Sequence, residues 1–185
     1  SGGRHPVPVL VRLGCWRPLP DAAPFSRLPR AAFSDVIEYA DADTGLVAVT
    51  SRQGSPCSIA VVGFALSCYP IAVRNGWLSR AAAAMRTLKI LRFFSESTQS
   101  QSPDATGYKG FYYHFLDMRT GKRVWQCELS LIDTALLIAG VLVAGSFFAG
   151  DGEEGGIRQL AEAASRRSDW RGAASGTAAP PRAWA

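Results

Sequence analysis

The chain has 185 residues, of which 48% are hydrophobic and 19% charged, a composition typical of one globular domain. The net charge of +5 comes from the ends: residues 1–30 hold five Arg and one Asp (+4), residues 166–185 hold four Arg and one Asp (+3), and the middle carries −2. Because no basic helix face accompanies this charge, we expect no nucleic-acid partner.

Metal, cofactor and membrane functions find little support in the sequence. The four cysteines form no CxxC pair and the chain has 2 histidines, so we expect no metal site and no cofactor. The longest apolar run, Ala135–Phe148, has 14 residues, and a membrane span needs about 20, so we expect a buried helix. No signal peptide is visible, and the compartment stays open between bacterial periplasm and cytoplasm.

Residues 1–30 contain six of the 11 prolines, which predicts an irregular Pro/Arg-rich tail. The pattern changes from Ala31, where Phe33, Val36, Ile37 and Tyr39-Ala40 suit a short amphipathic helix with Ser34 as its expected N-cap. Ser55-Pro56 is expected to start a second helix, because Ser is a good N-cap and Pro suits the first helical position. That helix carries an apolar run, Ile59–Val73, and stops at Asn75-Gly76.

Ser79 is expected to cap a third helix, antiparallel to the second because the link between them is short. Its apolar face, at helical spacing, consists of Met85, Leu88, Leu91 and Phe93-Phe94.

Aromatic and β-branched residues at 111–116 and 123–127 flank Arg119–Lys122, which predicts a β-hairpin. Strand alternation would place Tyr113 and Phe115 on one face and Tyr112 and His114 on the other.

Leu131–Phe148 predicts a fourth helix. The spacing of Ile157, Leu160, Ala161 and Ala164 predicts a fifth, with acidic residues at its start and basic residues at its end. Residues 171–185 are low-complexity sequence without periodic apolar positions.

Four segments of the chain resemble the glycoamylase-like domain family, which is related to the endo-β-1,2-glucanases of glycoside hydrolase family 144. They are Thr44–Val47, Ser51–Ala60, Thr106–Asp117 and Cys127–Leu137. The resemblance covers residues 31–170. It implies a mostly α fold, the N-terminal part of an (α/α) barrel of helix pairs with one β-hairpin, and a sugar cleft lined by carboxylates.

Two departures from the family pattern bear on activity. Family members usually have an acidic residue where this chain has Ala48-Val49-Thr50, and they continue past Asp169-Trp170 through further helices. Here residues 171–185 replace that continuation, as a frameshift or a truncated reading frame would produce. We therefore expect a partial barrel with disordered ends and little or no hydrolase activity.

Glu128 is the expected catalytic residue, because glycoside hydrolysis needs a carboxyl group that protonates the leaving oxygen or activates water. Apolar surroundings would raise its pKa and suit it to the acid role; the alternative is a carboxylate that only favours the helix start. Asp133, three residues after Ser130, reads as half of a capping box. Asp117 precedes a tight turn and is expected to shape it.

The expected substrate contacts are aromatic and basic side chains near the predicted hairpin. Sugars stack on aromatic faces and bind hydroxyl donors, although such aromatics also fill cross-strand contacts and exposed basic residues are often only solvated. The candidates are Tyr112, Tyr113, His114, Trp125, Lys109 and Arg52.

Two functions are compatible with these features. The first is a fragment of a glycoside hydrolase-like protein that acts on a glucan-type poly- or oligosaccharide. The alternative is a non-catalytic helical interaction module or a non-functional truncated product. In either case an incomplete barrel would expose an apolar face of the Ala135–Phe148 helix, which favours self-association.

Overall fold

The computed structural model describes residues 27–171. Its elements, in chain order, are α1 (Arg27–Glu38), β1 (Cys57–Ser58), α2 (Ile59–Arg74), α3 (Arg80–Glu96), β2 (Gly107–Tyr108), β3 (Phe111–Tyr113), β4 (Phe115–Leu116), β5 (Leu129–Ser130), α4 (Leu131–Phe147) and α5 (Glu153–Arg167). The tails expected at 1–30 and 171–185 fall almost wholly outside the described residues. Residues 27–30 are an exception, because they begin α1.

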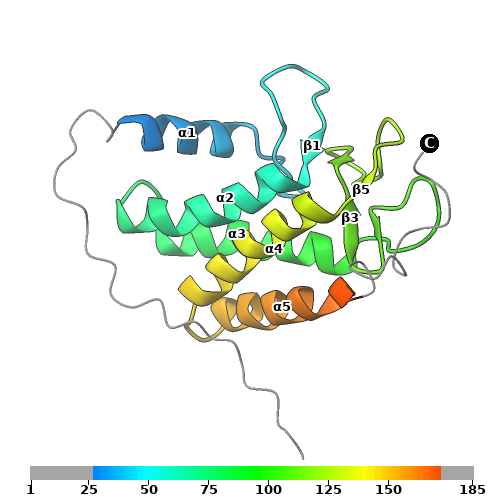
Figure 1. Cartoon of the computed structure of the whole chain (residues 1–185). Helices are drawn as coiled ribbons and strands as arrows, with labels where there is room; N and C mark the ends of the chain where they lie inside the picture. The colour runs from blue at the N-terminus through cyan, green and yellow to red at the C-terminus, as the bar shows by residue number, and fades with distance from the viewer. Residues whose placement is uncertain (1–26, 172–185) are drawn as a thin grey trace, which may run out of the picture.

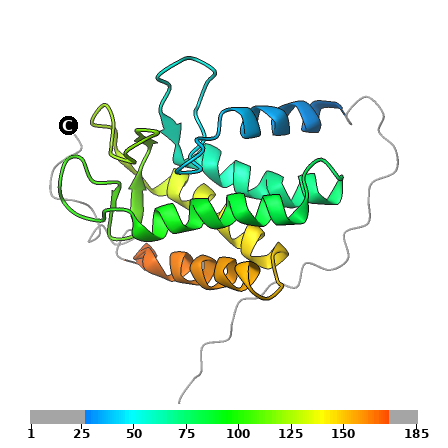
Figure 2. The same ribbon diagram turned by 180° about the vertical axis from the view of Figure 1, so that it is seen from behind.

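The helices form an open stack, with the short strands gathered at one end (Figure 1). α2 packs mainly against α4, and α5 packs against both α3 and α4. Seen from behind, α3 lies in front of α2 and α4 (Figure 2). Over residues 27–171 the helices do not close into a barrel, and the expected mostly α fold with short antiparallel strands is confirmed.

Two glycines allow α2 and α4 to pack closely. A Cβ at Gly63 would lie 2.8 Å from the Leu136 carbonyl carbon, and a Cβ at Gly140 would lie 2.7 Å from the Gly63 carbonyl carbon. Both distances are shorter than real Cβ contacts, so the two backbones approach as near as they can. The α2–α4 pair therefore depends on small residues at its crossing point.

Two small antiparallel sheets hold the strand end together. In the first, β1 pairs with β4, with Cys57 opposite Leu116. In the second, β3 lies between β2 and β5, with Tyr113 opposite Leu129. These pairings connect the start of α2 and the start of α4 to the same aromatic segment.

The hairpin expected from residues 111–127 is shorter than its aromatic pattern suggested. Around the 119–122 turn, pairing includes one bridge between Leu116 and Arg123. Two backbone bonds accompany it, from the Asp117 N–H to the Lys122 carbonyl and from the Val124 N–H to the Phe115 carbonyl. Trp125 and Gln126 have positive φ values of 56° and 52°, which an extended strand does not accommodate. β3 pairs with β2 and β5 instead.

Several predicted helix ends are confirmed. The Ser79 hydroxyl accepts a hydrogen bond from the Ala82 N–H, and the Ser130 hydroxyl accepts one from the Asp133 N–H. Asn75 is the C-cap of α2, and Gly76 follows it with φ of 70°.

Three predictions about the helices are wrong. Ser34 lies inside α1, where its hydroxyl donates to the Arg30 carbonyl. α2 begins at Ile59 rather than at Ser55-Pro56, because the preceding residues stay extended to pair with Ala48 and β4. Met85 is 57% exposed and lies outside the core face of α3.

Within residues 27–171, no helix combines the length and the apolar character that crossing a membrane requires.

Candidate functional site

His114 lies between β3 and β4, and its backbone is held from both sides. Its N–H donates to the Glu128 carbonyl at 3.0 Å, and its carbonyl accepts from the Ile59 N–H at 3.3 Å. The ring stacks on Phe115, with centroids 3.9 Å apart. These contacts fix the imidazole at the edge where α2 and α4 begin.

Two carboxylates meet at the His114 ring. Glu128 Oε1 and Asp133 Oδ2 each lie 3.2 Å from His114 Nδ1. The two oxygens are therefore no more than twice that distance apart. Because Nδ1 carries at most one proton, it cannot donate a full hydrogen bond to both carboxylates at the same time.

Asp133 is the residue of this cluster for which the sequence favoured a helix-capping role. Its backbone N–H does receive the Ser130 cap, but its carboxylate faces His114. Oδ2 is buried and makes no hydrogen bond with the described residues. The sequence did allow this contact. The Ser130 cap needs only the backbone N–H of Asp133, so the Asp133 carboxylate is free to contact another residue.

Glu128 is more exposed and more acidic than expected. Its side chain is 53% exposed. Its pKa is lowered from the ordinary 4.5, first by a hydrogen bond from its own backbone N–H and then by the bond to His114. The expected rise in pKa through apolar surroundings is therefore wrong, and at neutral pH Glu128 is an ionised carboxylate. It is suited to accept a proton or to bind a positive centre.

Trp125 extends the cluster with an exposed aromatic surface. Its side chain is 72% exposed, and its ring meets Phe115 edge-on at 5.4 Å. Together with Gln126 it adopts a left-handed backbone conformation that costs an ordinary residue about 1 kcal/mol. Such local strain is often found where side chains are held for function.

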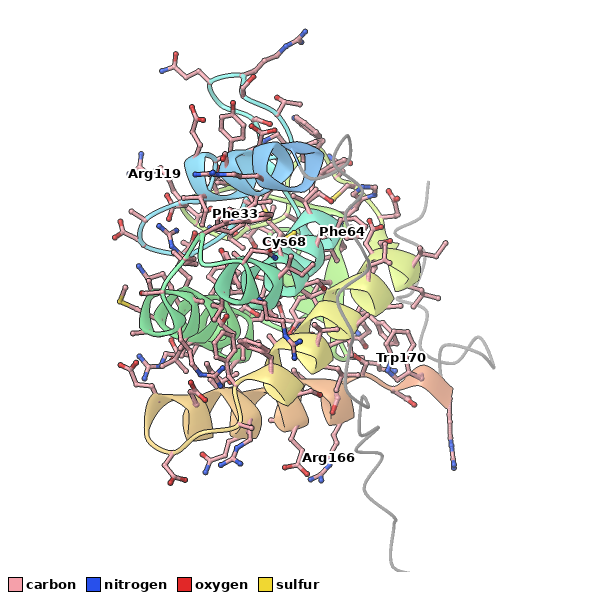
Figure 3. The ribbon with its side chains drawn as sticks, turned by 90° about the vertical axis from the view of Figure 1, so that its left-hand side faces the viewer. Phe33, Phe64, Cys68, Arg119, Arg166 and Trp170 are labelled. Atoms are coloured by element: carbon pink, nitrogen blue, oxygen red, sulfur yellow. The ribbon has the colours of Figure 1, made fainter. Side chains whose placement is uncertain are left out.

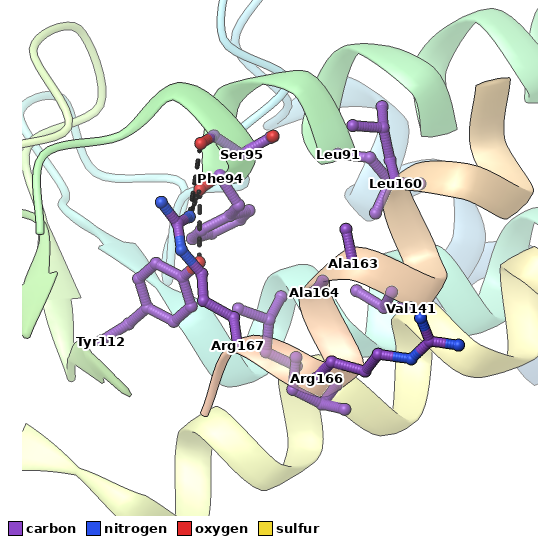
Figure 4. Close-up of a pocket in the computed structure, with 12 residues that line it drawn as sticks. Leu91, Phe94, Ser95, Tyr112, Val141, Leu160, Ala163, Ala164, Arg166 and Arg167 are labelled. Carbon is purple, nitrogen blue, oxygen red and sulfur yellow. Dashed lines mark hydrogen bonds between the residues drawn. The ribbon is translucent and has the colours of Figure 1, made fainter. Parts of the chain in front are cut away.

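The two tyrosines predicted to contact substrate lie in the core. Tyr112 is 2% exposed, and its hydroxyl donates to the Phe94 carbonyl at 3.3 Å (Figure 4). Tyr113 is 4% exposed, with the Arg123 guanidinium 4.3 Å from its ring centroid. Neither offers a sugar a face to stack on in this structure, and their ligand role stays a prediction. The sequence pattern missed this because strand alternation does not tell which neighbouring helix covers a face.

The basic candidates lie apart from the cluster. Lys109 belongs to the β2–β3 turn, where its ammonium lies 5.5 Å from the Tyr108 ring centroid. Arg52 is exposed in the loop between α1 and β1. Asp117 shapes its turn as predicted, since its carboxylate accepts bonds from the Arg119 and Thr120 N–H groups.

Two hollows of the described structure are not lined by His114, Glu128 or Asp133. One, of about 370 Å³, lies between α3, α4 and α5, and Arg167 borders it while donating to the carbonyls of Phe94 and Ser95 (Figure 4). Another, of about 440 Å³, lies beside α3 near Lys89 and Arg92. Between residues 27 and 171, no group of three or more His, Cys, Asp or Glu side chains could hold a metal ion.

No protein-family model matches the sequence, and no curated protein matches it significantly. Solved structures do match. A glucoamylase-like protein from Bacteroides uniformis aligns with a TM-score of 0.75 and 23% identity over 87% of this chain and 39% of its own. A β-1,2-glucanase from Parabacteroides distasonis aligns with a TM-score of 0.68 and 23% identity, over 78% of this chain and 20% of its own.

An endo-β-1,2-glucanase from Chitinophaga pinensis, solved with sophorotriose and glucose, aligns with a TM-score of 0.68 and 18% identity. The alignment covers 79% of this chain and 36% of the Chitinophaga pinensis protein. The chain has the fold of the part of these proteins that it matches. It spans well under half of the length of each, and the resemblance seen in the sequence is confirmed at the level of this glucanase-like fold.

The lowered pKa of Glu128 gives a direct prediction. We expect its side-chain carboxyl, followed by NMR, to titrate with a midpoint below 4.5. Because the folded value lies below the ordinary one, its contribution to stability is present above about pH 4.5 and is lost as the pH falls through the folded value. His114→Ala should raise the midpoint.

Asp117 is the internal reference for this titration. Its pKa is lowered mainly by bonds from the Thr120 N–H and hydroxyl, which His114→Ala does not remove. A Glu128 midpoint that stays in place when His114 is replaced would show that the ring does not interact with this carboxylate.

Proposed function

We propose that the chain is part of a glycoside hydrolase-like protein and binds a glucan-type poly- or oligosaccharide at the edge formed by His114, Glu128, Asp133 and Trp125. The proposal rests on one observation above all: two carboxylates meet one imidazole beside an exposed tryptophan. The glucanase-like fold supports the choice of ligand, because a structure with this fold was solved with sophorotriose and glucose.

Each member of this edge suits a part of sugar recognition. An indole face stacks on the C–H face of a pyranose ring, and carboxylates accept hydrogen bonds from sugar hydroxyls. The ionised Glu128 is the proposed catalytic carboxylate, in the role of base rather than acid because at neutral pH it holds no proton to donate. His114 is the proposed positioning residue, since it contacts Glu128 through both backbone and ring.

Hydrolysis by the 185-residue chain alone is expected to be negligible. Glycosidic cleavage needs an acid and a base held across the bond, in a site that excludes water. Glu128 is 53% exposed and borders neither of the hollows near α3. The edge offers a binding surface, but it has no closed apolar pocket that would raise the pKa of a catalytic carboxylic acid.

The test is binding of sophorotriose, followed by NMR chemical shifts of the Trp125 indole and by calorimetry. We expect Trp125→Ala to weaken binding about tenfold, the effect of losing about 1.4 kcal/mol of stacking. Met85→Ala is the matched control, because Met85 is also exposed (57%) but lies on α3. An affinity that is absent, or equal in Trp125→Ala and the unmodified chain, would contradict the proposal.

Catalysis is measured separately, as reducing ends released from β-1,2-glucan. We expect no release above background by the chain or by Glu128→Gln. Release by the unmodified chain that Glu128→Gln abolishes would show instead that the exposed carboxylate is enough for turnover.

A further inference from the structure

The outer side of α4 is apolar along its whole length. Its exposed residues recur at helical spacing, from the first turn to the last but one. The large ones are Ile132 at 76%, Leu142 at 48%, Leu131 at 42%, Val143 at 38% and Leu136 at 37% exposure, and the small ones are Ala135 and Ala139. A helix on the surface of a monomer normally presents polar residues there.

α2 extends this surface. Phe64 is 56% exposed and Ile71 49%, and they lie two turns apart on the same side of α2. In Figure 3, Phe64 lies on the side of α2 nearest α4. We call Phe64, Ile71, Ile132, Leu136, Leu142 and Val143 the α2–α4 face.

The α2–α4 face has no charged side chain. Asp133 is the single ionisable residue of α4, and its carboxylate contacts His114 instead. Arg74, at the last position, is the single charged residue of α2. Two copies of this face can therefore meet without burying a charge or opposing like charges.

The size of the face decides how strongly it can associate. α4 has 17 residues and is therefore about 25 Å long. Two packed helices are about 20 Å wide, so the α2–α4 face covers about 500 Å². The largest apolar patch of a typical monomer is about 300–600 Å² and is often a functional surface. Stable dimers bury about 800 Å² per partner, so this area fits a weak, concentration-dependent one.

We propose that a second copy of this chain covers the α2–α4 face, in a two-fold dimer with α4 packed against α4 of the partner copy. A two-fold axis brings the same patch of both copies together, which an uncharged stripe of mixed small and large residues permits. Ala135 and Ala139 leave room for the Leu and Ile side chains of the other helix. The interface includes Ile132, which directly precedes Asp133 of the proposed sugar site.

The experiment is sedimentation velocity and light scattering of the full chain over about 5 to 500 μM, a range that brackets a weak dimer. We expect the mass to rise from monomer to dimer and to stop there. Leu142→Lys should weaken the dimer at least tenfold, and Ile132→Glu should do the same. Lys has a good helix propensity and Glu suits the first turn, so both variants are expected to keep the helix.

Met85→Lys is the control, since it adds the same charge at an exposed apolar residue of α3 and should leave the dimer unchanged. Circular dichroism verifies that each variant is folded. A monomer at every concentration overturns the proposal and leaves the face to another occupant, such as further helices of the longer related folds. A mass that grows past the dimer, or a dimer that Leu142→Lys and Ile132→Glu do not weaken, also overturns it.

Discussion

Replacing Gly140 by alanine is expected to lower the free energy of unfolding by about 3 kcal/mol, the upper part of the range for overpacked cores. The added Cβ would lie 2.7 Å from the Gly63 carbonyl carbon and 2.8 Å from its Cα. Both obstacles are backbone atoms, so no side chain can turn away to make room. α2 and α4 would have to separate along their contact.

Gly155→Ala is the matched control for this prediction. It also lies inside a helix, but its nearest neighbour would be the end of the Arg158 side chain at 3.9 Å. We expect this variant to gain roughly 0.5–1 kcal/mol, because alanine favours the helix over glycine. Urea unfolding followed by circular dichroism measures both. Equal stabilities of the two variants would show that the α2–α4 crossing is looser than the structure has it.

The helices could be predicted from the sequence because their signals are local. The apolar run of α4, the cap at Ser79 and the Asn75-Gly76 stop depend on neighbours within a few residues. The start of α2 could not be predicted this way. Ser55-Pro56 is a good helix start in isolation, but pairing of residues 57–58 with β4, nearly sixty residues later, keeps the chain extended until Ile59.

The candidate site was predictable only in part, for a similar reason. Glu128 and His114 could be named from residue type and resemblance, and the structure brings them together. That Asp133 joins them depends on how α4 starts against β5, which no local pattern contains. The sequence also does not show how exposed each side chain is. Tyr112 and Trp125 are both aromatic, but Tyr112 is buried against α3 and Trp125 faces solvent.

Gly110→Ala is expected to lower the free energy of unfolding by about 3 kcal/mol, from about 1 kcal/mol of left-handed strain and a further steric cost. Gly110 has φ of 83° in the two-residue turn between β2 and β3. A Cβ there would lie 2.6 Å from the Ser168 Cα. The Ser168 hydroxyl donates to the Gly110 carbonyl at 2.8 Å, so the turn also anchors the end of α5.

The same substitution should act on the candidate site. β3 pairs with β5, and His114 directly follows β3 while Glu128 directly precedes β5. A displaced turn would therefore loosen the contact between His114 and Glu128 and raise the Glu128 pKa. Gly76→Ala is the control, because φ there is 70° and no atom lies within 4 Å of the added Cβ, so it adds the left-handed strain without the clash and away from the sheet. If Gly110→Ala lowers stability but leaves the Glu128 titration unchanged, the site is held by α4 and not by the sheet.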